Sequence, residues 1–435
     1  MAVQHDPLQV LSAFLTRHPA PSILIAYSGG MDSHVLLHAC ATLRPQFPAL
    51  GLQAMHIDHG LQAGSAAWAQ HCAATCAALA VDFSSMRLAL EPRTGISLEA
   101  QAREARYQAL AAVLPPDAML LTAHHQRDQA ETVLLNLLRG AGVDGLAAMP
   151  TVRPFGPGRL GRPLLALPHA ALLAYAHRKG LHWVEDPSNA SETPDRNFLR
   201  HTVLPLLAGR WPGVEQTLAR AAGLQAESRA VLEILLPEKL AQVAGSRPRT
   251  LSIKRLQLLE PALQSALLRQ WFRELALPLP GRERLLQIPA TVLSARADAL
   301  PRVAWPGGEV RRFRDDLYAL PPLPPHDPAC VLPWLQPDQP LWLAGSGTWL
   351  EPLPLAWRES LAGDGVVLTV RFWQPGQPVR HPGGRRVAMK KHFQQAGIPP
   401  WERSRIALVY ADACLIRIAG VRDFIDRPAG APDSG

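Results

Sequence analysis

The segment with the clearest chemical potential is a short loop with the sequence S-G-G-M-D-S. It follows an apolar run at residues 22–27 and precedes residues of helical character. Glycines, which lack a Cβ, let a backbone turn sharply and bring its amides close to an anion. The first N–H groups of the following helix have no intrahelical partner and favour negative charge. We therefore expect a nucleotide-phosphate site, in which Asp32 holds Mg²⁺, formed by Ser28, Gly29, Gly30, Met31, Asp32 and Ser33.

This loop differs from the two commonest phosphate-binding loops. It lacks the lysine and the spacing of G-x-x-x-x-G-K-[ST], and it is not G-x-G-x-x-G. It resembles the pyrophosphatase (PP) loop of the N-type ATP pyrophosphatases, which split ATP between the α and β phosphates and adenylate a substrate. The loop alone indicates only that superfamily.

A second group of candidate residues lies in T-A-H-H-Q-R-D-Q-A-E-T, residues 122–132. His124 ends an apolar run, and Asp128 and Glu131 fall three apart at the start of the next predicted helix. Carboxylates at that position can be simple helix caps. Beside histidines, we interpret them as catalytic, with Asp128 as a further Mg²⁺ ligand and His124 in the ATP site. Asp58, between the two histidines of H-I-D-H-G, is expected to bind Mg²⁺ or the adenosine.

Arginines in two segments are candidates for binding phosphate or carboxylate groups. Arg103 shares one face of a predicted helix with Glu99 and Arg106. We expect Arg103 to act in catalysis, with an exposed salt-bridged face as the alternative. Arg196 and Arg200 lie in D-R-N-F-L-R, a polar segment that suits a bound nucleotide or an RNA backbone. We expect both to contact RNA, with a solvated loop as the alternative.

The most basic stretch of the chain is residues 371–405, with eight Lys and Arg residues against Glu402 alone. Trp373, Phe393 and Trp401 are interleaved with the positive charges. Positive charge with aromatic side chains fits phosphate contacts plus base stacking, whereas a solvated basic face is the alternative. We expect RNA contacts from Arg380, Arg385, Arg386, Lys390, Lys391 and Arg403.

These residues need a scaffold, and the first two hundred residues alternate strands with helices. Apolar runs predict strands at 22–27, 52–58, 81–88 and 118–124, and helices at 66–79, 97–114 and 129–139. The alternation is typical of an α/β fold with a doubly wound parallel sheet, similar to the Rossmann fold. Ligands bind beyond the carboxyl ends of such strands, where Ser28, Asp58 and His124 fall.

The composition sets bounds on the rest of the protein. The chain has 435 residues, enough for two or three domains, and a net charge of +8 that favours a polyanionic partner. We expect a catalytic domain at 1–212, a largely helical, RNA-binding middle domain at 213–320, a proline-rich linker at 321–340 and a small basic α+β domain at 341–435. No apolar run reaches the ~20 residues of a membrane span, and we expect no signal peptide. Five scattered cysteines suit a reducing cytoplasm.

In their order, the motifs resemble those of the bacterial tRNA(Ile)-lysidine synthetases. The N-terminal resemblance runs through S-G-G-M-D-S, H-I-D-H-G, E-A-Q-A-R-E-A-R-Y, T-A-H-H-Q-R-D-Q-A-E-T, L-L-R-G-A-G-V-D-G-L, E-D-P-S-N and R-N-F-L-R. The tail resembles the C-terminal domain of that family through K-K-H-F-Q-Q-A-G-I-P-P-W-E-R. The middle of the chain is unspecific.

The resemblance implies a ligase that forms a carbon–nitrogen bond at the expense of ATP, with Mg²⁺. ATP would adenylate the C2 oxygen of the wobble cytidine of a tRNA(Ile) with a CAU anticodon, and free L-lysine would displace AMP. The product, lysidine, would change the tRNA from methionine to isoleucine specificity. A homodimer is left open, and no membrane partner is expected.

One position departs from the pattern of this family, which commonly has two adjacent aspartates in H-H-x-D-D-Q. Here the first of them is Arg127 and the second is Asp128. Two other functions remain open. A tRNA thiolase would need cysteines near the loop, and the chain has only Cys72 and Cys76 as a close pair. A non-catalytic RNA-binding protein would have less need for carboxylates beside phosphates.

Overall fold

The structure is a computed structural model that describes residues 6–58, 65–88, 98–185, 193–296, 299–344, 346–361, 366–376, 379–380 and 388–424. The chain divides into two compact units, residues 1–234 and 235–435. The division falls inside the 29-residue helix α10 (Val214–Gln242) rather than at the expected boundary near residue 212. Each unit is described by itself.

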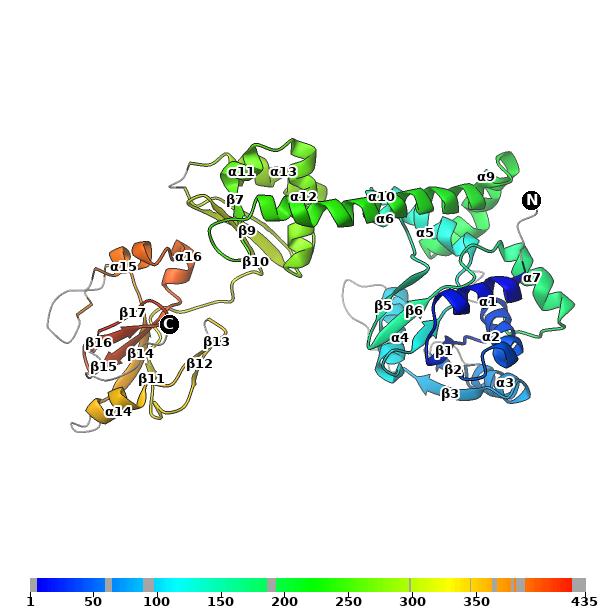
Figure 1. Cartoon of the computed structure of the whole chain (residues 1–435), viewed down its shortest axis with the longest axis horizontal. Helices are drawn as coiled ribbons and strands as arrows, with labels where there is room; N and C mark the ends of the chain where they lie inside the picture. Colours follow the sequence, from blue (N-terminus) through cyan, green and yellow to red (C-terminus); the bar gives the residue numbers. More distant parts are fainter. Residues whose placement is uncertain are drawn as a thin grey trace. The chain divides into compact units, whose positions relative to one another are not determined.

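A six-stranded sheet organises the first unit, in the order β3-β2-β1-β4-β6-β5 (Figure 1). Five strands are parallel, and β5 alone runs antiparallel to its neighbour β6. The strands are β1 (Ser22–Ala26), β2 (Gly51–Asp58), β3 (Asp82–Arg87), β4 (Met119–Leu121), β5 (Val152–Phe155) and β6 (Gly158–Gly161). The predicted doubly wound parallel sheet is confirmed, and β5 and β6 extend it beyond the four strands that the sequence indicated.

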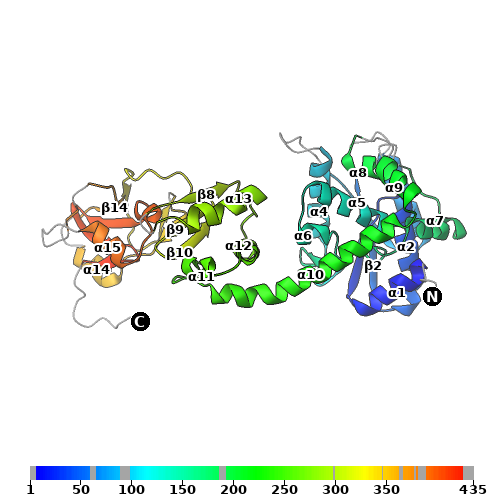
Figure 2. The same ribbon diagram turned by 90° about the horizontal axis from the view of Figure 1, so that it is seen from above.

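Alternate residues of the central strands pack on opposite faces of the sheet. Ile23 and Ile25 of β1 enter one core with side chains of α1, α2, α3 and α7, whereas Leu24 enters a second core beside α4. Figure 2 shows α2 and α4 on the two sides of β2. A strand buried on both faces reads as a continuous apolar run, which is why β1 is evident in the sequence.

Helices connect these strands and complete the first unit. They are α1 (Pro7–Arg17), α2 (Met31–Leu43), a 3₁₀ turn (Arg44–Gln46), α3 (Ser65–Ala78), α4 (Leu98–Val113), α5 (Gln126–Leu138), α6 (Val143–Leu146), α7 (His169–Arg178), α8 (Asp195–Phe198), a π-helical turn (Leu199–Val203) and α9 (Leu204–Arg210). Because β1 lies between β2 and β4, the loops after these strands open at one edge of the sheet.

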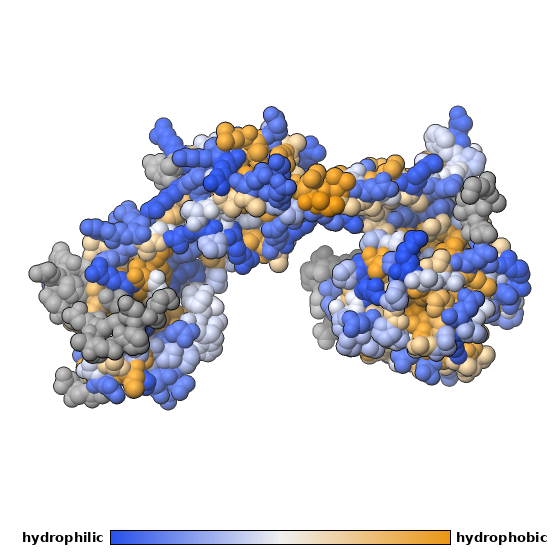
Figure 3. Space-filling model, viewed as in Figure 1, coloured by the Kyte–Doolittle hydropathy of each residue, from blue (hydrophilic) through white to orange (hydrophobic). Residues whose placement is uncertain are grey.

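Helix α10 carries several exposed apolar side chains along its length, among them Leu224, Val231, Ile234 and Leu235. Figure 3 shows hydrophobic, orange surface along part of this helix. No helix within the described part of the chain is both long enough and apolar enough to cross a membrane.

The middle of the chain adds an antiparallel sheet to the helices expected there. The order of this sheet is β7-β10-β9-β8. Its strands are β7 (Leu251–Ser252), β8 (Arg302–Trp305), β9 (Gly308–Phe313) and β10 (Asp316–Leu320), and its helices are α11 (Ile253–Gln257), α12 (Pro261–Glu274), α13 (Arg282–Gln287) and a π-helical turn (Ile288–Leu293). Trp271, Phe272 and Trp305 pack together in its core.

The C-terminal part forms a five-stranded sheet in the order β11-β14-β15-β16-β17 and a separate hairpin, β12–β13. Its elements are β11 (Leu332–Pro333), β12 (Leu341–Leu343), β13 (Thr348–Leu350), α14 (Leu355–Leu361), β14 (Leu368–Phe372), α15 (Met389–Gln395), α16 (Pro400–Arg403), β15 (Ala407–Ala411), β16 (Cys414–Ile418) and β17 (Arg422–Asp423). The segment expected as a linker therefore contributes β11 to this sheet, and Trp334 to its core.

Candidate active site

The loop between β1 and α2 has the geometry of an anion cradle. Gly30 caps α2 without any side-chain hydrogen bond, so the cap residue leaves the first N–H groups of the helix for an anion to bind. Ser33 Oγ accepts a hydrogen bond from the backbone N–H of Ser28 at 3.2 Å and donates to the carbonyl of Gly30 at 2.9 Å. The two serine hydroxyls lie 3.0 Å apart. These contacts hold the turn closed before any ligand arrives.

Gly29 is the residue that makes this turn possible. Its φ of +85° lies in the left-handed region that side chains with a Cβ rarely adopt. A Cβ at this position would also lie only 3.0 Å from Cys72 Sγ of α3. The sulfur thus packs directly beneath the loop, and glycine is required for two independent reasons.

The cysteines near the loop are buried and remain thiols at neutral pH. Burial raises the pKa of both Cys40 and Cys72 to about 12 and that of Cys76 to about 11. The thiolate is the form of cysteine that carries out sulfur chemistry. Cys72 and Cys76 therefore behave as small buried side chains. They do not supply the reactive thiolate that a tRNA thiolase would need.

Asp32, in the first turn of α2, faces two histidines from other elements. His125 Nε2 lies 3.6 Å from one carboxylate oxygen, and His169 Nε2 lies 3.8 Å from the other. The latter oxygen, Oδ1, is buried and lacks a hydrogen-bond partner among the described residues. An unpartnered carboxylate oxygen beside a phosphate cradle is the donor that a hard cation requires.

These three side chains could themselves enclose a metal ion, because one ligand atom of each lies within 4.8 Å of the others. The hydrogen bonding of His125 argues against a two-histidine site. Its Nδ1 accepts the backbone N–H of Arg127 at 3.3 Å, so the proton of the neutral ring sits on Nε2. That proton points toward carboxylates, which leaves Asp32 as the main candidate ligand.

His125 also joins the loop to the second predicted motif. It is the N-cap of α5, and its Nε2 lies 3.3 Å from Asp128 Oδ2. Burial disfavours the charged imidazole, but the Asp32 and Asp128 carboxylates outweigh it and raise the pKa of His125. In the same way, His125 lowers the pKa of Asp128 despite the burial of that carboxyl group.

Glu131 lies one turn further along α5 and is completely buried. Its Oε1 accepts a hydrogen bond from Arg200 Nε at 2.7 Å and its Oε2 one from Arg196 Nε at 2.8 Å. Arg200 also donates to Asp128 Oδ1 at 3.1 Å, and the carboxylates raise the pKa of Arg200 although its burial works against the charge. Both arginines, expected on RNA, thus have carboxylate partners inside the protein.

This network changes the interpretation of Asp128. Its second oxygen, Oδ2, accepts the backbone N–H of His125 at 3.0 Å as part of a capping box. Both oxygens of Asp128 therefore already accept hydrogen bonds, whereas Asp32 Oδ1 accepts none among the described residues. The structure favours Asp32 over Asp128 as the position of a metal ion.

The other candidates of the N-terminal domain, His124, Arg103 and Asp58, have other contacts. Burial lowers the pKa of His124 to about 3, and its Nδ1 lies 2.8 Å from Thr122 Oγ1. The Arg103 guanidinium lies 5.3 Å from the centre of the Tyr107 ring. Asp58 ends β2 and lies 3.8 Å from Arg87 Nε. None of these three has a described contact with Asp32.

Sequence reasoning missed His169 and left His125 out of the site. His125 was visible as the second histidine of a motif, whereas His169 begins α7 in a segment without any recognised pattern. Only the fold brings it within reach of the loop, where its ring lies 5.1 Å from that of His125.

In the C-terminal sheet domain, the basic candidates Arg380, Lys390 and Lys391 are exposed, and Arg403 is half-buried with its Nε bonded to the carbonyl of Ile398. Arg385 and Arg386 lie outside the described residues. The aromatic residues interleaved with these charges pack against other aromatic side chains of the protein. Phe393 is fully buried and contacts Trp373. Trp401 packs against Phe313 and Tyr318.

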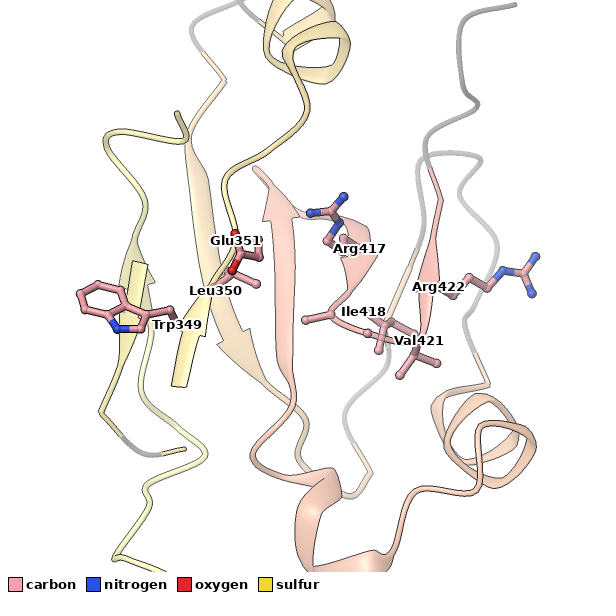
Figure 4. Close-up of a pocket in the computed structure, with 9 residues that line it drawn as sticks. Trp349, Leu350, Glu351, Arg417, Ile418, Val421 and Arg422 are labelled. Carbon is pink, nitrogen blue, oxygen red and sulfur yellow. The ribbon is translucent and has the colours of Figure 1, made fainter. Parts of the chain in front are cut away.

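Two other tryptophans are exposed instead. Trp342 and Trp349 face each other across the β12–β13 hairpin, 5.1 Å apart, with 46% and 60% of their surfaces exposed. Beside the hairpin lies a hollow of about 530 Å³ between Leu350 and Glu351 on one side and Arg417 and Arg422 on the other. In Figure 4 the Trp349 and Arg422 side chains point away from this hollow in opposite directions.

Comparisons with known proteins agree along most of the chain. The sequence profile of the PP-loop domain matches residues 4–207, that of the TilS substrate binding domain matches 251–318, and that of the TilS substrate C-terminal domain matches 368–426. The tRNA(Ile)-lysidine synthase of Methylococcus capsulatus is 41% identical over 96% of this chain and 95% of its own. The one from Alkalilimnicola ehrlichii is 43% identical over 95% and 94%. The one from Escherichia coli O157:H7 is 40% identical over 92% and 91%. The chain therefore belongs to the tRNA(Ile)-lysidine synthase family and carries an ATP-binding PP-loop domain.

Proposed function

We propose that this protein joins L-lysine to C2 of the wobble cytidine of a tRNA(Ile) with a CAU anticodon, using ATP. The observation that carries this proposal is the near full-length identity with proteins named tRNA(Ile)-lysidine synthase, combined with a preorganised loop at the carboxyl end of β1. The first step transfers AMP from ATP to the cytidine O2 and releases diphosphate. In the second step the lysine amine attacks C2, loses a proton and displaces AMP.

The chain supplies binding and orientation for both steps. The N-terminal amides of α2 and the hydroxyls of Ser28 and Ser33 would hold the phosphates, with Asp32 Oδ1 as the protein ligand to Mg²⁺. When bound, Mg²⁺ would neutralise charge on the phosphate oxygens. His125, which lies between Asp32 and Asp128, fixes the distance from the loop to α5.

The buried network behind the loop would act by positioning. Glu131 has no exposed surface, so it reaches the reactants through Arg196 and Arg200 rather than directly. Asp128 is slightly exposed and borders the loop, and we propose that it faces the substrates together with Arg103. The exposed Arg380, Lys390 and Lys391 would contact the tRNA backbone, and they would act together with Arg385 and Arg386.

The test is mass spectrometry of nucleosides after the purified protein has been incubated with the tRNA, ATP, Mg²⁺ and each amino acid in turn. A cytidine heavier by one lysine less one water, formed with lysine only, is the expected result. Asp32→Asn serves as the matched control, because it keeps the shape of the side chain and removes its charge. Formation of a thiolated cytidine when a sulfide donor replaces lysine would contradict the proposal.

A further inference from the structure

Arg127 is the second residue of α5, a position where positive charge is electrostatically unfavourable. The N-terminus of a helix carries partial positive charge, and anions rather than cations are stabilised there. The sequence nevertheless places a guanidinium at this point, two residues after the His125 cap and directly before Asp128. Such a residue needs either a compensating anion or a function that uses its charge.

The compensating anion is Glu215, and its ion pair with Arg127 is partly exposed. Arg127 Nε donates to Glu215 Oε1 at 2.8 Å, with 33% and 24% of the two side chains exposed. Glu215 lies in the first turn of α10, where the helix dipole already stabilises its negative charge. The carboxylate therefore tolerates the loss of this partner, and a partly exposed ion pair is weak enough to be exchanged.

The rest of the Arg127 guanidinium is available to a ligand. Among the described residues, its Nη groups take part in no hydrogen bond or ion pair. An arginine offers five N–H donors in a planar fork that matches the oxygens of a phosphate group.

Arg127 lies at the end of α5 that is next to the nucleotide loop. His169 is the residue whose Nε2 lies 3.8 Å from Asp32 Oδ1. Two residues before Arg127, His125 Nε2 lies 3.6 Å from the other oxygen of Asp32. The N-terminal end of α5, which carries Arg127, thus borders the loop.

We propose that Arg127 exchanges Glu215 for the β and γ phosphates of ATP and stabilises the diphosphate that leaves. Without nucleotide, Glu215 holds the guanidinium beside the loop. With ATP bound, the more highly charged phosphates displace the carboxylate. The inference rests on the proposed use of ATP. Its competitor is a permanent structural link between α5 and α10.

Ligand exchange and a permanent structural link predict different effects of Glu215→Gln on nucleotide affinity. The measurement is calorimetric binding of α,β-methylene-ATP, which cannot be split between its α and β phosphates, in the absence of tRNA and lysine. Arg127→Gln should weaken binding about tenfold, the size expected for one charge-assisted hydrogen bond. Glu215→Gln should strengthen binding, because it removes the competitor for Arg127. AMP, which lacks the β and γ phosphates, should bind Arg127→Gln and the unsubstituted protein alike.

Arg139→Gln is the matched control, because Arg139 follows the last turn of the same helix and is 67% exposed. It removes one positive charge far from the loop along α5 and should leave binding unchanged. A structural link predicts that Arg127→Gln and Glu215→Gln lower stability in urea equally and leave nucleotide affinity alone. That pattern, or weaker binding by both variants, would overturn the inference. Failure of the unsubstituted protein to bind the analogue would overturn both this inference and the proposed function. If the variants show the expected binding pattern but the protein forms no lysidine, only the proposed function would be overturned.

Discussion

Arg200 Nε donates a hydrogen bond of 2.7 Å to Oε1 of Glu131, a carboxylate with no exposed surface. Arg196, one helical turn earlier, takes the other oxygen. The partners differ in their environment, since about a quarter of each arginine side chain reaches the surface. Loss of the arginines would strand a buried charge, whereas loss of the carboxylate would leave two cations that can turn toward water.

This asymmetry predicts the order of two stability changes. The double variant Arg196→Gln/Arg200→Gln should lower the free energy of unfolding by about 3–5 kcal/mol, because it leaves an uncompensated buried charge. Glu131→Gln should cost less. Urea unfolding followed by circular dichroism measures both. A larger loss for Glu131→Gln would mean that the arginines cannot reorient, and the account of the network would be wrong.

A second prediction concerns the turn that holds the loop. Gly29→Ala should weaken nucleotide binding and cost about 1–2 kcal/mol of stability from its left-handed backbone alone. Adding Cys72→Ala should recover only the part due to the contact with the sulfur, 3.0 Å from the new Cβ. Gly30→Ala is the control, because Gly30 has φ −75° and its Cβ would meet Ser28 Oγ at an ordinary 3.5 Å. Equal effects at the two glycines would contradict this reading.

The pairing of Asp128 with His125 predicts a specific pH dependence. The lowered pKa of Asp128 means that its stabilising effect is present above 3.8 and is lost as pH falls through the folded value. The raised pKa of His125 means that its contribution is present below 6.5 and is lost as pH rises through the folded value.

The stability difference between the unsubstituted protein and Asp128→Asn should therefore be largest near about pH 5–6 and shrink on both sides. Urea unfolding from pH 3.5 to 9 gives this profile. Asp195→Asn, which removes an exposed carboxylate of α8, serves as the reference. A difference that stays flat across the range would show that the two groups are not coupled.

Much of the fold of the catalytic domain could be predicted because the apolar runs in the sequence coincide with the strands that the fold buries. Ile23, Leu24 and Ile25 are buried on both faces of the sheet, so β1 reads as an unbroken apolar run. Strands β5 and β6 carry one proline, two glycines and two arginines, and they depend on pairing with β4 and with each other. Nothing in their own sequence distinguishes them from loops.

The site residues likewise fall into those that local sequence predicts and those that depend on distant partners. Ser28 to Ser33 form a contiguous loop whose chemistry is visible in the sequence. The partners of Glu131 are Arg196 and Arg200, more than sixty positions away, and a sequence cannot tell a cation for RNA from a cation for a buried carboxylate. For the same reason Phe393 and Trp401 resembled a stacking surface, although Phe393 is fully buried and Trp401 packs against Tyr318.

The buried aromatic residues also determine how the basic tail must be tested. Deletion from Trp373 onward would remove β15 and β16 from the core, so loss of tRNA affinity would report unfolding. The exposed Lys390 and Lys391 in the first turn of α15 can be changed without touching that core. If both lysines neutralise tRNA phosphates, Lys390→Gln/Lys391→Gln should make the slope of log affinity against log salt shallower by about 1.4–1.8.

The measurement is tRNA binding at several salt concentrations, beside nucleotide binding by calorimetry. Lys179→Gln, at the exposed C-cap of α7 in the first unit, controls for the loss of general positive charge. Nucleotide affinity should be the same in all three proteins, because the phosphate loop lies in the other unit. An unchanged salt slope in a folded double variant would mean that this basic face is only solvated and that the tRNA backbone is neutralised elsewhere.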